Sequence, residues 1–147
     1  MKLLKWFLFL FYILVVGYIV FFARRRHIIV WHDGLVNLIP VVRTIESFQS
    51  EATGRWNFFS NLFGNVALFI PLPFFLASLF KVANEKYILV ISLFISALIE
   101  GAQYAWRVGV PDVDDVLLNV LGAFIGLLLW NTILSNRYAH SLLNKLS

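Results

Sequence analysis

The sequence predicts an all-α fold: an integral membrane helical bundle with four transmembrane helices and an interfacial or re-entrant loop after the first. The 147-residue chain is 61% hydrophobic and 14% charged, whereas soluble domains are roughly 45–50% apolar and about 25% charged. Its mean hydropathy is +0.83. The apolar residues also gather in long segments, so most of the chain must be surrounded by lipid.

Four segments have the length of roughly 20 residues that a helix needs to cross a bilayer. They span about residues 3–23, 58–80, 87–106 and 116–134. Lys5 is the only charge in the first segment, and its ammonium group can reach the interface from the helix end. We expect this segment to be a retained helix, because its apolar stretch is longer than that of a signal peptide and no small-residue cleavage site follows.

Prolines and glycines should shape the later spans. Pro71 and Pro73 lack the backbone donors of a continuous helix, so we expect the second span to kink or break there. Gly122 and Gly126 form a Gly-x-x-x-Gly motif in the fourth span, which allows two helices to approach closely. We therefore assign these glycines to helix packing.

The connection after the first span, residues 24–57, mixes charged side chains with apolar pieces that are too short to cross a bilayer. An interfacial or partly re-entrant loop fits this pattern. The other connections are short, and we expect residues 1–147 to form a single membrane domain.

A polar stripe marks the start of the second span. Asn57, Asn61 and Asn65 recur every four residues and therefore share one face of a helix. The stripe fits helix–helix hydrogen bonding, with Gly64 allowing close approach, and equally the lining of a polar pocket. Both interpretations stay open at this stage.

A carboxylate lies inside the third span. Glu100, Gln103 and Arg107 fall at i, i+3 and i+7, on one helix face. An acid at that depth must be paired, protonated or in contact with water. A structural pair with Arg107 would satisfy it, but the spacing is long for a direct contact, and we favour a functional role.

Acids also precede the fourth span. Asp112 or Asp114 can cap that helix, where its dipole favours negative charge. Three carboxylates in four residues nevertheless exceed what a cap requires. Asp112, Asp115 and Asn119 share one face if the helix begins early.

Four spans would bring these polar groups to one side of the membrane. The second span begins on the side where the third ends and the fourth begins. Every acid near a span, except Glu85, lies on that side. This asymmetry is the strongest indication of a site.

The sequence resembles the VanZ-like family of bacterial membrane proteins over about residues 35–130. The resemblance is carried by four pieces in a fixed order: Asn37-Leu38-Ile39-Pro40 with Arg43-Thr44-Ile45, Asn61-Leu62-Phe63-Gly64-Asn65 running to Phe69-Ile70-Pro71-Leu72, Glu100-x-x-Gln103, and Asp112-x-x-Asp115 with Asn119 and Gly122. Pro73 departs from the family, which often has glycine after the proline of the second span. With these motifs, the candidate binding cluster is Asn37, Arg43, Asn61, Asn65, Glu100, Gln103, Arg107, Asp112, Asp115 and Asn119.

The resemblance also implies a setting. The named member of the family is associated with low-level resistance to the glycopeptide teicoplanin, which implies a role in the cell envelope. The family further implies a bacterial cell membrane location with the motif-bearing face outside and both termini in the cytoplasm. Lys and Arg divide six and six between the two sides, so the positive-inside rule gives no orientation. The Arg24–Arg26 cluster alone argues for the opposite one.

Three functions are compatible with this pattern. The first is an accessory protein that binds a lipid, a lipid-linked envelope precursor or an amphiphilic drug of the glycopeptide type at the polar cluster. The second is a membrane-embedded hydrolase or transferase acting on a lipid, with Glu100 and Asp112 or Asp115 as acid and base or as ligands of a divalent metal. The third is a small transporter or a scaffold for a partner protein.

The composition narrows the chemistry further. The chain has no cysteine, which excludes disulfides, thiolate nucleophiles and Cys-ligated metals. It has no Gly-x-Ser-x-Gly motif and no cluster of histidines, so we expect no cofactor and no metal, and no catalytic residue can be named. Nothing in the sequence suggests nucleic-acid binding, and oligomeric state is left open.

Overall fold

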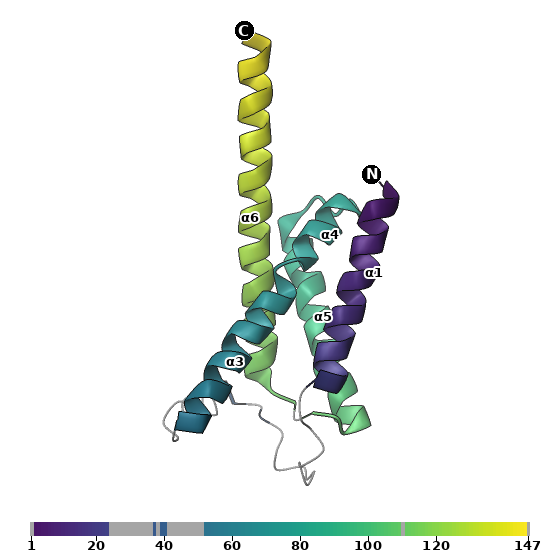
Figure 1. Ribbon diagram of the computed structural model, residues 1–147, viewed down its shortest axis with the longest axis vertical. Helices are drawn as coiled ribbons and strands as arrows, with labels where there is room; N and C mark the ends of the chain where they lie inside the picture. Colours follow the sequence, from purple (N-terminus) through teal and green to yellow (C-terminus); the bar gives the residue numbers. More distant parts are fainter. Residues whose placement is uncertain (1, 24–36, 38, 41–51, 110, 147) are drawn as a thin grey trace.

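A computed structural model of the chain describes residues 2–23, 37, 39–40, 52–109 and 111–146. The described residues are helical apart from short turns, and they contain no β-strand. The elements in chain order are α1 (Lys2–Tyr18) with the π-helical turn η1 (Ile19–Ala23), α3 (Ala52–Phe69), α4 (Leu72–Ser78), α5 (Glu85–Trp106) and α6 (Val113–Leu146) (Figure 1).

Four stretches of this fold are long and apolar enough to cross a membrane. They are Lys2–Phe22, Phe58–Ser78, Glu85–Trp106 and Val113–Leu134. The prediction of an all-α membrane bundle with four spans is therefore confirmed. The predicted loop after the first span, with Arg43, lies outside the described residues except for residues 37, 39 and 40.

The second span is broken at its prolines, as predicted. α3 ends at Phe69, and Pro71 occupies the N-cap position of α4. Pro73 lies in the first turn of α4, where a missing N–H leaves no helical hydrogen bond unmade. The break gives α4 a different direction from α3 (Figure 1).

The core of the bundle lies where α3, α4 and α5 pack against α6. Gly122 and Gly126 are in close contact with α3: a Cβ at Gly122 would overlap the Val66 carbonyl oxygen, and one at Gly126 would overlap that of Ile70. The Gly-x-x-x-Gly motif thus packs helices closely. Gly64 does not, because a Cβ there would meet nothing within 4 Å. The buried apolar residues at this junction are Phe69, Leu72, Leu76, Ile88, Ala123 and Leu127.

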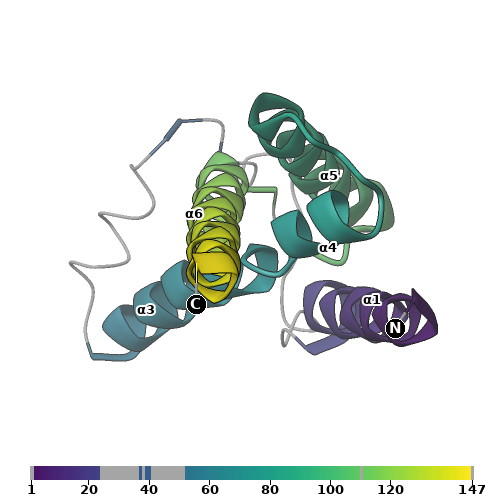
Figure 2. The ribbon, with the colours of Figure 1, turned by 90° about the horizontal axis from the view of Figure 1, so that it is seen from above.

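α1 attaches to the bundle through aromatic side chains. It lies beside α4 and α5 and away from α6 (Figure 2). The Tyr12 hydroxyl donates to the Leu68 carbonyl oxygen at 2.8 Å, and its ring stacks on Phe75. Phe9 packs edge-on against Phe75 and Phe80. α1 is therefore held in place by rings and one hydrogen bond.

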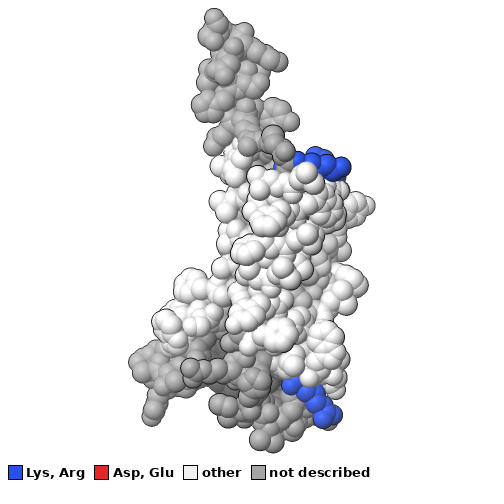
Figure 3. Space-filling view, turned by 45° about the vertical axis from the view of Figure 1, so that its right-hand side comes forward, with Lys and Arg blue, Asp and Glu red and all other residues white. Residues whose placement is uncertain are grey.

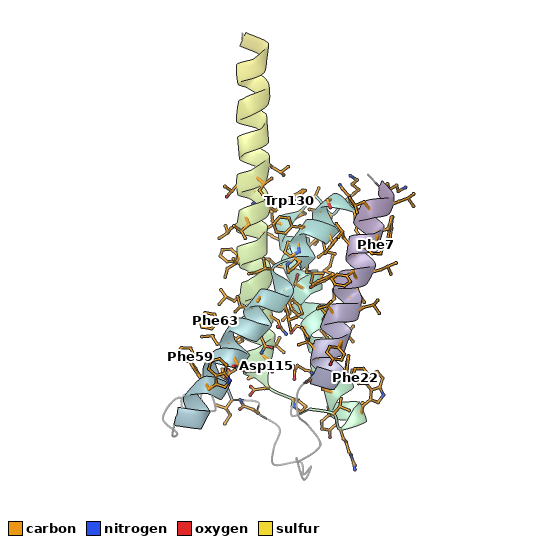
Figure 4. The ribbon with its side chains drawn as sticks, in the orientation of Figure 1. Phe7, Phe22, Phe59, Phe63, Asp115 and Trp130 are labelled. Atoms are coloured by element: carbon orange, nitrogen blue, oxygen red, sulfur yellow. The ribbon has the colours of Figure 1, made fainter. Side chains whose placement is uncertain are left out.

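The outer surface suits a bilayer. On the face shown in Figure 3, a band without charged side chains lies between Lys and Arg side chains at its two ends. Large apolar side chains point outward from several helices, including Phe7, Phe22, Phe59 and Phe63 (Figure 4). The two termini lie towards the same end of the molecule, and α6 extends past the other helices there (Figure 1).

Candidate ligand site

Polar side chains meet at the end of the bundle opposite the termini. There α3 begins, α5 ends and α6 begins, with Asp115 close to the start of α3 (Figure 4). Buried polar residues from all three helices and from the first loop lie at this end. They are Asn37, Asn65, Ser96, Glu100, Gln103, Asp114, Asp115 and Asn119.

Asn37 ties the first loop to the start of α6. Its backbone N–H donates to the Pro111 carbonyl oxygen at 3.0 Å, and its own carbonyl oxygen accepts from the Val113 N–H at 3.1 Å. Its side-chain Nδ2 donates to Asp112 Oδ1 at 2.7 Å, while its Oδ1 accepts from the Ile39 N–H at 3.2 Å. The backbone and side-chain polar groups of Asn37 are thus all used within the protein.

Asp112 is the cap of α6. Its Oδ1 accepts from the Asp114 N–H at 2.9 Å, which satisfies one of the free donors at the helix start. Its backbone N–H donates to Glu100 Oε2 at 3.0 Å. Burial raises the pKa of the Asp112 carboxyl, and the hydrogen bonds from Asp114 and Asn37 oppose that rise. Glu100 therefore holds the connection between α5 and α6 in place.

Asparagines of α3 contact the first turns of α6. Asn61 Nδ2 donates to Asp115 Oδ1 at 2.6 Å, and Asn65 Nδ2 donates to Asn61 Oδ1 at 3.4 Å. Asp115 is only 5% exposed. Asn61 therefore makes a helix–helix hydrogen bond, as one interpretation of the polar stripe requires, and Asn65 lines the cavity described next, as the other requires.

Asn119 carries an unsatisfied buried acceptor. Its Nδ2 donates to Ser96 Oγ at 2.9 Å across the α5–α6 contact, and the residue is 4% exposed. Its Oδ1 is buried without a hydrogen-bond partner among the described residues. Buried amide oxygens are nearly always paired, so this atom marks a place where a ligand or a water molecule could donate a hydrogen bond.

A cavity of about 300 Å³, counted with its opening, lies at this point between η1, α3, α5 and α6. One part of its wall is apolar and the other is polar. The lining residues are Ile19, Val20, Asn65, Leu68, Phe69, Ile99, Glu100, Gln103, Asp115 and Asn119.

Comparison of the chain with known proteins identifies its family. The VanZ/LLP1 family matches residues 9–134. The chain belongs to the VanZ-like family. It is 29% identical over 134 residues to Protein VanZ of Enterococcus faecium, covering 86% of this chain and 72% of that protein. No solved structure matches.

The VanZ-like motifs are divided between two neighbouring places. Asn65, Glu100, Gln103, Asp115 and Asn119 line the cavity. Asn37 and Asp112 form the cap beside it, and Asn61 joins α3 to Asp115.

Two predicted members of the cluster are placed differently. Arg107 follows the end of α5 in the left-handed conformation (φ 54°), is exposed, and is not among the residues that line the cavity. Arg43, like the side chain of Asn57, lies outside the described residues.

Sequence reasoning missed Ser96. A serine in a membrane helix is unremarkable by itself, yet Ser92, Ser96, Glu100 and Gln103 are spaced by four, four and three residues. That spacing puts them on one face, and all four are buried. Extending the Glu100 face towards the start of the span would have found the partner of Asn119.

The cap of this VanZ-like protein offers a stability test with a matched control. Asp112→Ala removes the cap and leaves the Asn37 amide without its acceptor, so we expect a loss of about 1–3 kcal/mol in the free energy of unfolding. Asp112→Asn keeps an acceptor for both bonds, and we expect it to differ from wild type by less than about 0.5 kcal/mol. Thermal unfolding in detergent, followed by tryptophan fluorescence, measures both.

The same pair tests the charge of Asp112. Because its pKa is raised in the folded state, the folded protein binds more protons than the unfolded one above the ordinary value of 3.8. The free energy of unfolding should therefore fall as the pH rises from the ordinary pKa of 3.8 through the raised pKa of the folded state. Asp112→Asn should lose this part of the pH dependence, and an unchanged slope in that variant would contradict the assignment.

Proposed function

We propose that this protein binds the polar headgroup of a membrane lipid or of a lipid-linked envelope precursor in the cavity between η1, α3, α5 and α6. Through that binding it contributes to tolerance of envelope-directed antibiotics of the teicoplanin type. The observation that carries the proposal is the unpaired Asn119 Oδ1 in a buried, polar wall. An orphaned acceptor of this kind is costly unless a ligand or water satisfies it.

The walls of the cavity favour a lipid. Val20, Leu68, Phe69 and Ile99 supply an apolar side, and the acids and amides supply a polar one. Exposed apolar side chains cover the outside of the same helices. A headgroup in the cavity could therefore keep its acyl chains along the lipid-facing surface of the bundle.

The size of the cavity separates the candidate ligands. The volume of about 300 Å³ includes the open space at the mouth, so the enclosed part of the cavity is much smaller. A small donor group at the end of a headgroup is what this space could admit, and a whole glycopeptide is many times larger. A drug of that class would place only one of its groups here.

The antibiotic part of the proposal rests on membership in the VanZ-like family. In the same proposal the protein lies in a bacterial cytoplasmic membrane, with the cavity near its outer surface and both termini in the cytoplasm. Reporter fusions before residue 2 and after residue 112 test this orientation, and a cytoplasmic signal from both would contradict it.

Binding is favoured over catalysis by the use of the acids. The Asp112 carboxylate is engaged in the cap of α6, which leaves Glu100 and Asp115 on the cavity. Within the described part of the chain, no group of three or more His, Cys, Asp or Glu side chains could hold a metal ion. Recovery of a cleaved or modified lipid would point to the enzyme alternative.

The test combines native mass spectrometry with resistance. Glu100→Gln and Asp115→Asn keep the side-chain shapes and an acceptor for the bonds from Asp112 and Asn61. We expect each to lower the amount of co-purifying lipid about tenfold, equivalent to about 1.4 kcal/mol. Each should also abolish protection against teicoplanin in a susceptible host, at unchanged protein levels.

Glu85→Gln is the matched control. Glu85 lies at the other end of the bundle, where it accepts from Asn131 Nδ2 at 2.9 Å. The Glu85→Gln variant should bind lipid and protect against teicoplanin as the wild-type protein does. If all three variants retain both properties, the cavity is not the binding site and the proposal is rejected.

A further inference from the structure

We infer that the enclosed inner end of this cavity is a binding site for a single water molecule, held by the side-chain amide of Asn119. The inference goes beyond the proposed function and does not depend on it, because a water can occupy this site whether or not the protein binds a lipid. It comes from the hydrogen bonds of one amide, from the size of the enclosed space and from the acceptors that lie beside it.

The Asn119 amide has one buried polar atom that the described part of the chain leaves unpaired. Its Nδ2 donates to Ser96 Oγ at 2.9 Å, whereas its Oδ1 has no hydrogen-bond partner there. Buried polar atoms that lack a protein partner are commonly satisfied by an ordered water molecule. The amide oxygen therefore marks a position where a water can donate a hydrogen bond.

A water satisfies this amide in either of its two orientations. A rotation by 180° exchanges the oxygen and nitrogen of an asparagine side chain. In the rotated orientation the Ser96 hydroxyl can donate to the Asn119 oxygen, and the NH₂ group is then the one that needs a partner. Water both donates and accepts hydrogen bonds, so one molecule can pair with whichever group remains.

The enclosed part of the cavity has about the size of one water molecule. Most of the space of about 300 Å³ belongs to the open mouth. Apolar side chains of Leu68, Phe69 and Ile99 form part of the wall. One water therefore fits beside the amide, and a donor group of a headgroup can reach the same position only by displacing it.

Carboxylates in the same wall can serve as the second partner of the water. Asp115 precedes Asn119 by one turn of α6, and Glu100 lines the cavity from α5. A carboxylate has about four lone-pair positions. It can thus accept from a water in addition to other bonds, such as that from Asn61 to Asp115. The water then has the two or more polar partners that buried waters have.

The depth of the site makes this water part of the protein. Asn119 lies six residues after Val113, the first residue of α6, which is about 9 Å along the helix axis. Acyl chains supply no hydrogen bonds at such a depth. The water therefore replaces hydrogen bonds that lipid cannot make. In the proposed function, a headgroup that donates to Asn119 takes the place of this water.

The experiment detects the water directly. The purified full-length protein, delipidated and isotope-labelled in its asparagine side chains, is studied by NMR with transfer of magnetisation from water to the amide protons. We expect a cross-peak at the Asn119 NH₂ group, with opposite signs in the laboratory and rotating frames, which separates a long-lived bound water from hydrogen exchange. A crystal structure that resolves ordered water should show one molecule within hydrogen-bond distance of the Asn119 side chain.

Variants show whether the amide holds the water. Asn119→Leu combined with Ser96→Ala removes the amide and its partner together, so neither member of the pair is left unsatisfied. We expect its crystal structure to lack the water and its midpoint of thermal unfolding to be no lower than that of wild type. Asn131→Leu is the matched control, because Asn131 lies on the same helix at the other end of the bundle, where it donates to Glu85. It should keep the Asn119 cross-peak.

The outcomes separate the water from the proposed function. The absence of both the cross-peak and the water density in the delipidated wild-type protein would overturn the inference and leave lipid binding standing. Water density that is unchanged in the double variant would also overturn it, because the amide would not be the holder.

Adding back a mixture of phosphatidylethanolamine and phosphatidylglycerol tests the link between the two. Loss of the cross-peak as lipid binds would support both the water site and the headgroup site. A cross-peak that persists while native mass spectrometry shows bound lipid would support the water and place the headgroup outside the enclosed end, against the proposed function alone.

Discussion

Replacing Gly122 or Gly126 with alanine is expected to destabilise the bundle by about 1–3 kcal/mol each, and valine at either position is expected to prevent accumulation of folded protein. The reason is the α3–α6 contact. A Cβ at either glycine would overlap a backbone carbonyl oxygen of α3, at Val66 or Ile70. Backbone cannot rotate away as a long side chain can, so the two helices must separate.

Separation of α3 from α6 would also affect the cavity. Asn61 and Asn65 are on α3, and Asp115 and Asn119 are on α6. We therefore expect Gly122→Ala to lower both the midpoint of thermal unfolding and the amount of bound lipid. Five tryptophans provide the fluorescence signal for the first measurement.

The matched controls are Gly64→Ala and Gly101→Ala. Neither glycine has an atom within 4 Å of the position that a Cβ would take. Alanine is a better helix former than glycine by up to about 1 kcal/mol, so these variants should be as stable as wild type or slightly more stable. A Gly122→Ala protein that unfolds at the same temperature as Gly64→Ala would show that the helices are not in close contact there.

The spans could be predicted from the sequence because lipid imposes simple demands. A helix must be about 20 apolar residues long, and proline removes a donor wherever it stands. Both effects depend on the residues of one segment alone. The four spans and the break at Pro71 and Pro73 follow from them.

Contacts between segments could be predicted only in part. Periodicity puts Glu100 and Gln103 on one face but does not say what faces them. The bond from Asn37 to Asp112 joins residues 75 positions apart, and that from Asn119 to Ser96 joins residues 23 apart. The sequence does not show which glycine faces another helix. Gly64 and Gly122 were therefore both candidates for close packing, although only Gly122 is in close contact with a neighbouring helix.

Helix ends were a second source of error. Arg107 shares the Glu100 face only if α5 continues through it. The helix instead ends at Trp106, and the left-handed backbone of Arg107 turns the chain away from that face. Of the two cations predicted in the cluster, Arg107 is thus not among the described residues that line the cavity, and Arg43 lies outside the described residues.

Exchanging the two side chains that join the first loop to α6 gives the sharpest test of this end of the molecule. Asn37 Nδ2 donates to Asp112 Oδ1 at 2.7 Å, and Asn37 is 7% exposed. Asn37→Asp replaces the donor with a second carboxylate at hydrogen-bond distance from the first. We expect a loss of about 2–4 kcal/mol in the free energy of unfolding near neutral pH.

The reciprocal variant Asn37→Asp with Asp112→Asn should recover most of that loss. Asparagine at position 112 can donate to the new carboxylate, and its Oδ1 can still accept from the Asp114 N–H, which keeps the cap of α6. An aspartate at position 37 can still accept from the Ile39 N–H. Because Asp112→Asn alone should be nearly neutral, the coupling energy between the two positions should be about 1–3 kcal/mol.

The pH dependence distinguishes repulsion from a simple loss of packing. Two adjacent carboxylates raise each other's pKa, so one of them takes up a proton more readily as the pH falls. The loss of stability caused by Asn37→Asp should therefore become smaller as the pH is lowered towards about 5. A packing defect would be the same at both pH values, and it would persist in the reciprocal variant. The Asp112 N–H donates to Glu100, so the Asn37–Asp112 pair is connected to a cavity acid. If the exchange removes the defect, the hydrogen bond from Asn37 helps to hold that end of the site in place.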